Sequence, residues 1–271
     1  GGVAVLCLAE GPYRFAAASV AGLTGGLDEA GQALARAARA QARPSPHAAA
    51  LLLTDSLLGD LQQFAQGVYR VAGARVALVG GAAGDEQRFK AASVFHDGRV
   101  LDRAALVLWI ASPHPLEVVT GHGWEPLGAA LLVTRAEGTE IVELDGRPAA
   151  EAYQEQLAGQ PPLTPETFWA TSVRHPFGLA QPDGTHVIRM ARAMSPAGAL
   201  TIQGCVPAVG SVVQVMRGAP DGLLAVADEV AGASLAAAPA PRVLLAFSCA
   251  ARANLLGGDA PDEARRLQAV A

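Results

Sequence analysis

Two kinds of apolar pattern alternate along the chain, and together they predict an α/β protein. Short continuous runs of Val, Leu, Ile and Ala, typical of buried strands, occur at residues 3–9, 48–53, 75–79, 104–110 and 242–247. Apolar residues at helical spacing occur at residues 27–43, 57–71, 148–157, 221–237 and 259–270. Asp-Gly at 97–98 and Glu-Gly-Thr at 137–139 predict tight hairpins, and residues 168–218 read as β.

An internal repeat predicts how these elements are organised. Residues 48–60 and 242–259 share one plan, in which an apolar run is followed by a small polar turn and a helix. We therefore expect two domains with mixed β-sheets and packed helices, related by an internal duplication. Their predicted ranges are residues 1–139 and 140–271. The chain starts almost directly in a strand and stops where the second copy should continue, so we expect a piece of a longer protein that lacks both terminal parts.

Composition narrows the class of protein. Hydrophobic residues make up 51% of the 271 residues and charged ones 17%, which is ample material for a core. The net charge of −5 and the absence of a basic run argue against a nucleic-acid partner. No apolar run has the length of a bilayer span, and no signal peptide is visible. Three dispersed cysteines predict neither disulfides nor a zinc site. We expect a cytoplasmic protein without a membrane partner.

The segment 120–128, TGHGWEPLG, is the most unusual local pattern. Three glycines and a proline in nine residues exclude a helix or a regular strand. His122 lies between two of the glycines, so its ring is free to face a ligand or to bond a backbone carbonyl. Trp124 follows and would either line a pocket or fill a core.

Two further turns bring polar groups to the ends of predicted strands. Gly80, Gly81 and Asp85 follow a strand and would either offer backbone N–H groups to an anion or form a tight turn. This sequence is not the G-x-G-x-x-G fingerprint, so a dinucleotide is not predicted. A second group comprises a cation, an imidazole and an aromatic ring around a proline, which suits a pocket rim or a solvated turn; its members are Arg174, His175 and Phe177.

The turn after residue 247 contributes two more candidates. Cys249 beside a cation is either an activated thiol or a buried, inert one. Arg252 follows an apolar run and needs an anion, either a ligand carboxylate or a structural Asp. The six histidines are scattered, and no G-x-S-x-G elbow or metal triad is visible. We therefore expect a protein that is not an enzyme and that holds no metal.

With these motifs in place, the sequence resembles the FIST family of sensory proteins. The markers are VALVGGAAGD at 76–85, GHGWEPLG at 121–128, ELDGRPAAEAY at 143–153, HPFG at 175–178, GCVPAVGSVVQVMRG at 204–218 and LLAFSCAAR at 244–252. The resemblance implies a FIST N domain followed by a FIST C domain. It also implies a cytoplasmic signal-transduction module that binds a small ligand, an amino acid or a derivative. We expect no resident cofactor.

The resemblance leaves other functions open. Some members of the family are haem-dependent nitric-oxide sensors, and some eukaryotic members act in ubiquitin ligation. A haem-based sensor and a protein-interaction scaffold are therefore alternatives, and the expected partners are a small molecule and a downstream signalling protein.

All four candidate turns follow predicted strands, and ligand sites in α/β folds gather at strand ends and domain interfaces. We therefore expect the turns to converge on one pocket between the two domains. There Arg252 would hold a ligand carboxylate, with the Gly81 N–H and His122 as lesser donors. Trp124 and Phe177 would supply the apolar walls.

Overall fold

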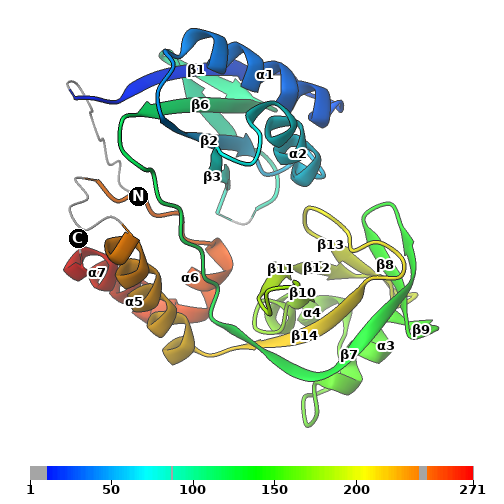
Figure 1. Ribbon diagram of the computed structural model, residues 1–271. Helices are drawn as coiled ribbons and strands as arrows, with labels where there is room; N and C mark the ends of the chain where they lie inside the picture. Colours follow the sequence, from blue (N-terminus) through cyan, green and yellow to red (C-terminus); the bar gives the residue numbers. More distant parts are fainter. Residues whose placement is uncertain (1–10, 87, 238–242, 271) are drawn as a thin grey trace. The chain divides into compact units, whose positions relative to one another are not determined.

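The computed structural model describes residues 11–86, 88–237 and 243–270. The chain divides into two compact units, residues 1–118 and 119–271. Each unit has its own sheets and helices (Figure 1), which confirms the α/β class. The division falls before the expected position at 139/140, because strand β7 (Trp124–Glu137) pairs with strands of the second unit.

The first unit is a small mixed sheet covered by two helices. Its elements are β1 (Arg14–Val20), α1 (Leu27–Gln41), β2 (His47–Asp55), α2 (Leu61–Ala72), β3 (Ala77–Ala83), β4 (Ser93–His96), β5 (Arg99–Asp102) and β6 (Ala105–Ser112). The sheet has the order β1-β6-β2-β3, with β2 and β3 parallel and the other neighbours antiparallel.

Alternate residues of the central strands face two different apolar clusters. Val107, Trp109 and Ala111 of β6 pack with α1 and α2 on one face of the sheet. Leu106 packs on the other face with the β4–β5 hairpin. This alternation is the period-two pattern of a strand buried on both sides.

Helices α1 and α2 pack so closely that glycine is required at the contact. A Cβ on Gly31 would lie 2.3 Å from the Phe64 carbonyl oxygen, and a Cβ on Gly67 would lie 2.1 Å from the Asp28 carbonyl oxygen. Glycine inside a helix costs about 1 kcal/mol relative to alanine, so close packing must offset that cost.

The second unit is built on one large antiparallel sheet. Its elements are β7, β8 (Glu140–Leu144), β9 (Arg147–Pro148), α3 (Ala149–Gln156), α4 (Pro165–Ser172), β10 (Phe177–Ala180), β11 (His186–Arg189), β12 (Ala191–Met194), β13 (Leu200–Ile202), β14 (Val212–Gly218), α5 (Pro220–Ala237), α6 (Ala250–Leu256), the 3-10 helix η1 (Gly257–Asp259) and α7 (Ala260–Val270). The strand order is β11-β10-β14-β7-β8-β13-β12, and β9 pairs with β8.

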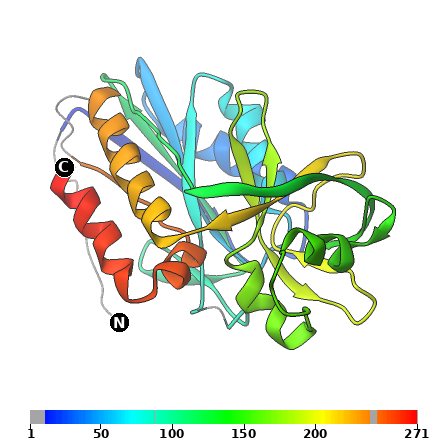
Figure 2. The same ribbon diagram turned by 90° about the horizontal axis from the view of Figure 1, so that it is seen from below.

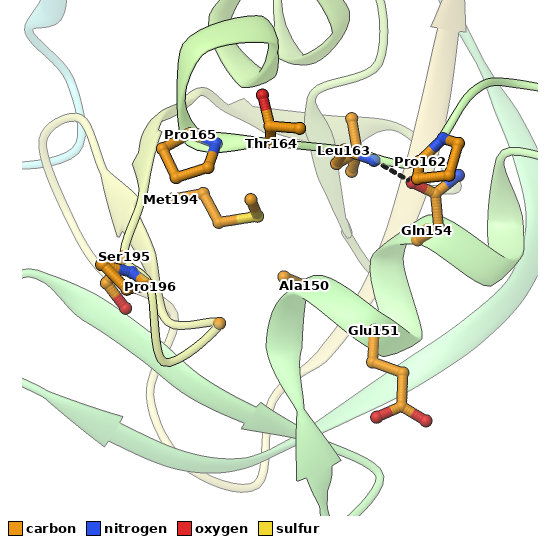
Figure 3. A pocket seen from close by; sticks show the side chains of 11 residues that line it. Ala150, Glu151, Gln154, Pro162, Leu163, Thr164, Pro165, Met194, Ser195 and Pro196 are labelled. Carbon is orange, nitrogen blue, oxygen red and sulfur yellow. Dashed lines mark hydrogen bonds between the residues drawn. The ribbon is translucent and has the colours of Figure 1, made fainter.

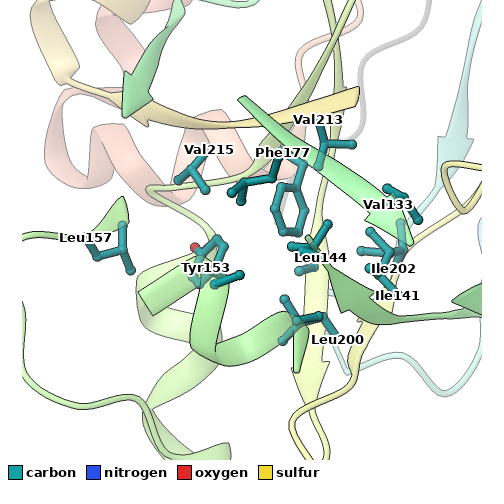
Figure 4. Packing of buried hydrophobic residues seen from close by; sticks show 14 of the residues in the cluster. Val133, Ile141, Leu144, Tyr153, Leu157, Phe177, Leu200, Ile202, Val213 and Val215 are labelled. Carbon is teal, nitrogen blue, oxygen red and sulfur yellow. The ribbon is translucent and has the colours of Figure 1, made fainter. Parts of the chain in front are cut away.

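Two apolar clusters stabilise this unit. The larger lies between the sheet and helices α3 and α4, where Tyr153 and Phe177 meet edge to face at 5.3 Å between ring centroids (Figure 4). The second is formed where α5 and α6 pack on the ends of β7 and β14. Trp124, Met216 and Leu223 belong to this second cluster, and the helices around it are seen from another side in Figure 2.

All five predicted helices and both hairpins are confirmed. The predicted helices at 27–43, 57–71, 148–157, 221–237 and 259–270 correspond to α1, α2, α3, α5 and α7. The apolar run at 3–9 lies outside the described residues. The β prediction for 168–173 is wrong, because Thr164 and Pro165 start helix α4 with a capping box.

The predicted buried strand at 242–247 is also wrong over its described part. Residues 243–247 belong to no strand, and Val243, Leu244, Leu245 and Phe247 are 40–50% exposed. The strand half of the predicted duplication is therefore not seen here, although α6 matches the position of α2 in the repeat.

Candidate functional site

The candidate site of the second unit starts at residues 121–124, which lie against helix α5. A Cβ on Gly121 would lie 2.9 Å from Val230 Cγ2, and a Cβ on Gly123 would lie 3.0 Å from the Gly222 carbonyl oxygen. Gly123 also has a φ of 75°, which favours glycine. The two glycines on either side of His122 therefore let the chain approach the helix closely.

His122 is held by its own loop. The backbone N–H of Trp124 donates to His122 Nδ1 at 3.0 Å, and the two rings lie 6.4 Å apart between centroids. Because Nδ1 accepts a hydrogen bond, the proton of the neutral ring resides on Nε2. Burial lowers the pKa of His122, and the charges of His186 and Arg252 lower it further.

Arg252 forms a buried ion pair with Glu263 and holds the loop at 121–124 through the His122 carbonyl. Its guanidinium donates from Nε to Glu263 Oε1 at 2.7 Å and from Nη2 to the same oxygen, and Glu263 Oε2 accepts a third bond from Ser248 Oγ at 2.5 Å. Arg252 Nη1 donates to the His122 carbonyl at 2.7 Å, and Nη2 donates to the Leu223 carbonyl at 2.8 Å. Arg252 and Glu263 are 6% and 8% exposed. Arg252 therefore holds Glu263 in place of the ligand carboxylate predicted for it, because the guanidinium is engaged by this glutamate and two backbone carbonyls. The structural alternative is the one found, with a glutamate where an aspartate was expected.

The indole of Trp124 is buried, and its N–H lacks a partner. Only 5% of Trp124 is exposed, and Nε1 makes no hydrogen bond among the described residues. The ring lies over Gly218, where a Cβ would come within 2.6 Å of both Nε1 and Leu255 Cδ1. A buried N–H without a partner lowers the stability of the fold by about 1–3 kcal/mol, and a hydrogen-bond acceptor would remove that cost.

The turn at 174–177 lies beside the same glycine. Gly218 N donates to the Arg174 carbonyl at 2.9 Å, and His175 Nδ1 lies 3.1 Å from the Met216 carbonyl. Burial is the main cause that lowers the pKa of His175. The Arg174 side chain is exposed and makes no ion pair among the described residues. Arg174 and His175 are therefore near Trp124, as expected.

Phe177 does not line a pocket. Its ring is 0% exposed and belongs to the larger core cluster, against Tyr153 (Figure 4). The prediction that Phe177 forms a pocket wall is wrong, because it begins strand β10 and alternation turns its side chain into the core.

The candidate residues of the first unit are structural. Gly80 and Gly81 are strand residues paired with Leu52 and Leu53, so the predicted glycine turn is in fact part of β3. A Cβ on Gly80 would lie 1.9 Å from the Leu52 carbonyl oxygen, which explains the glycine. The carboxylate of Asp85 accepts three backbone N–H groups, from residues 89, 90 and 91. The Lys90 N–H is the main cause that holds the pKa of Asp85 below its usual range.

Cys249 is an exposed thiol at the N-terminus of α6, so the alternative of a buried, inert thiol is wrong. Arg252, three positions on, is fully engaged by Glu263 and two carbonyls. The two residues of this turn are therefore not arranged as an activated thiol beside a free cation.

A hollow of about 430 Å³ lies elsewhere on the second unit, between α3, the start of α4 and the β12–β13 turn (Figure 3). Prolines, Met194 and small polar residues line it, and Gln154 accepts the Leu163 N–H at its edge. None of the predicted site residues lines this hollow, which separates it from the Trp124 region.

Sequence reasoning missed three residues of the site. His186 carries no motif of its own, Gly218 ends the marker at 204–218 without a chemical signal, and Glu263 is separated from Arg252 by a turn between two helices. Acidic residues early in α7 were visible in the sequence, but helical spacing alone does not pair one helix with another.

Comparison with known proteins covers nearly the whole chain. The FIST N domain model matches residues 1–147, and the FIST C domain model matches residues 149–271. An uncharacterized protein of Methanocaldococcus jannaschii is 31% identical over 83 residues, which is 31% of this chain and 16% of that protein. The chain therefore matches less than a fifth of that relative's length. No solved structure matches the chain. No helix in the described part is both long and apolar enough to cross a bilayer.

Proposed function

This chain belongs to the FIST family, whose domains are associated with sensory and signal-transduction modules, and from that premise we propose that its second unit binds an amino acid or a derivative. One observation carries the proposal. The buried indole N–H of Trp124 has no partner among the described residues. A ligand acceptor at this position would remove the cost of that unpaired group, a gain that favours binding.

The surrounding groups suit a carboxylate ligand. Arg174 supplies an exposed guanidinium. Its backbone carbonyl accepts the N–H of Gly218, the glycine that lies against the indole. His122 orients the loop beside the indole, because its Nδ1 accepts the Trp124 N–H and its ring also forms a hydrogen bond with the backbone of His186. The expected role of His122 as a ligand donor is therefore not part of this proposal. Arg252 serves in this proposal as a positioning residue, since it holds the carbonyl of His122 and not the ligand.

Binding at this position would also produce a signal. Leu255 of α6 lies against Gly218 beside the indole N–H. An acceptor that reaches Nε1 would therefore have to displace α6, so ligand affinity and the position of this helix would be coupled. A downstream protein that reads the position of α6 would then respond to the ligand.

Calorimetric titration of the full chain with a panel of amino acids tests this function. We expect one class of amino acid to bind. Arg174→Gln should weaken it about 10- to 100-fold, the loss of one charged hydrogen bond. Trp124→Phe, which removes the N–H and keeps a ring, should weaken binding about 2- to 10-fold.

The matched controls are Arg265→Gln, an exposed arginine of α7, and Trp169→Phe, a second indole of the same cluster. Neither should change the affinity for the amino acid. If no amino acid binds at millimolar concentration, or if the Trp124 and Arg174 variants retain full affinity, the proposed function is wrong.

The same residues speak against catalysis as the primary role. No described histidine is paired with both a nucleophile and a well-placed carboxylate in this site, and the His122 and His175 rings are each tied to the main chain through Nδ1. Neither ring lines either of the two hollows described for the chain. We therefore propose binding without a haem cofactor.

A further inference from the structure

A second candidate binding site lies entirely within the first unit, at the C-terminal ends of α1 and α2. It is a hollow of about 380 Å³, a size typical of small-molecule pockets. Arg39, Arg43 and Arg75 line it, and no carboxylate is among the described residues that do so. We refer to it as the arginine pocket. Its cations contrast with the net charge of −5 of the whole chain.

The pocket combines charge with an apolar floor. Trp109 and the alanines of neighbouring strands and helices form that floor, and the rim carries two prolines, which have no N–H to donate. Arg39 is fixed in place over Trp109, with its Cζ 5.8 Å from the ring centroid, and its Nη1 donates to the Val71 carbonyl at 2.9 Å. A guanidinium has five N–H donors, so most of those on Arg39 remain available.

Arg43 and Arg75 distinguish a binding site from simple stabilisation of helix ends. Cations near a helix C-terminus offset its dipole and bond its last carbonyls, as Arg39 does for α2. Arg43 and Arg75 follow the C-cap residues Ala42 and Gly73, yet neither forms a hydrogen bond or ion pair with any residue the structure describes. Other arginines of the chain pair with carboxylates at the surface, for example Arg70 with Asp28.

We propose that the arginine pocket binds a small organic anion with a carboxylate or phosphate head and a compact apolar body. Guanidinium groups bind both heads in bidentate fashion, and Arg43 with Arg75 would hold the head between them. The apolar body would cover the floor beside Trp109. This site lies in the first unit and does not depend on the function proposed for the second.

Calorimetric titrations of the full chain at fixed ionic strength test the proposal with four probes. Phenyl phosphate and phenylacetate carry the two heads, inorganic phosphate lacks the apolar body, and benzyl alcohol lacks the charge. We expect at least one aromatic anion to bind at least tenfold more tightly than inorganic phosphate, and benzyl alcohol not to bind. The stronger of the two aromatic anions identifies the head.

The variant Arg43→Gln/Arg75→Gln should bind that anion at least tenfold more weakly. Both side chains are exposed and unpaired among the described residues, so the variant should fold normally. Arg36→Gln/Arg99→Gln, which changes two exposed arginines of α1 and β5 outside the pocket, is the control matched for net charge and should keep the wild-type affinity. Equal losses in both variants would mean general charge attraction and would overturn the proposal.

Two further outcomes would overturn it. The apolar floor requires the aromatic anions to bind more tightly than inorganic phosphate, so equal affinities for the two would overturn the proposal. If the double variant unfolds at a lower temperature without anion while its anion affinity is unchanged, the arginines stabilise the helix ends and bind no ligand.

Discussion

At the scale of single residues, the buried pair of Arg252 and Glu263 joins three segments of the second unit. We expect Arg252→Ala to lower the free energy of unfolding of that unit by about 3–5 kcal/mol, because it leaves the Glu263 carboxylate buried without its counter-charge. Urea denaturation followed by tryptophan fluorescence measures this change.

Arg265→Ala is the control for that prediction. Arg265 pairs with Asp262 on the surface of the same helix, and an exposed pair contributes about 0–1 kcal/mol. If Arg252→Ala is as mild as this control, the buried pair does not hold the unit together.

The two half-buried histidines predict how stability depends on pH. Burial is the first cause that lowers the pKa of both His122 and His175 in the folded state, below the ordinary value of 6.5. The unfolded chain therefore binds more protons than the folded one as pH falls below about 6.5. Stability of the second unit should be fully present above that pH and should decrease as pH falls through the window down to the folded pKa values.

Thermal unfolding measured between pH 8 and pH 5 checks this sign. His122→Gln should flatten part of the decrease, whereas His114→Gln, an exposed histidine of the first unit, should leave it unchanged. A second unit that becomes more stable on acidification would contradict the expected direction.

The sequence located much of the Trp124 region but not its partners. The glycines around His122 marked the loop because only residues without a Cβ can lie so close to α5. The need of Arg252 for an anion was also visible. The identity of that anion, Glu263, depends on how α6 and α7 pack, and residue types along one helix do not encode that contact.

At the scale of elements, the contact between α1 and α2 depends on two missing side chains. Gly31→Ala should destabilise the first unit by about 1–3 kcal/mol, because its Cβ would lie 2.3 Å from a carbonyl oxygen of α2. That cost exceeds the gain of about 1 kcal/mol in helix propensity. Gly67→Ala should act in the same way, and thermal unfolding measures both.

Gly232→Ala is the matched control in α5. A Cβ there would meet no heavy atom within 4 Å, so only helix propensity changes, and we expect a gain of about 0.5–1 kcal/mol. Stabilisation by all three substitutions would show that the α1–α2 contact is looser than the structure has it.

Elements with local signals were predicted well, and elements that depend on distant partners were not. Helix α1 has its apolar stripe and acidic first turn within one stretch, and β2 is a continuous apolar run. Residues 243–247 are also a continuous apolar run but lack a described neighbouring strand. A strand is stabilised by its partners, so composition alone overpredicted it.

At the scale of the whole molecule, each unit has apolar clusters of its own. Among the described residues, two clusters lie in the first unit and two in the second. We therefore expect residues 119–271, expressed alone, to fold and to unfold cooperatively on heating, as followed by far-UV circular dichroism, and to retain the pH dependence assigned to His122. An unfolded fragment would contradict the independence of the two cores.

The exposed apolar residues at 243–247 should affect how the protein self-associates in solution. Four large apolar side chains stand 40–50% exposed in one short stretch, and contiguous patches of this kind bind to one another. Self-association of the purified chain should then increase with protein concentration. Sulfate and phosphate buffers should promote it by strengthening apolar contacts, and dilution should reverse it. A buffer with a low concentration of these salts should therefore keep the chain monomeric.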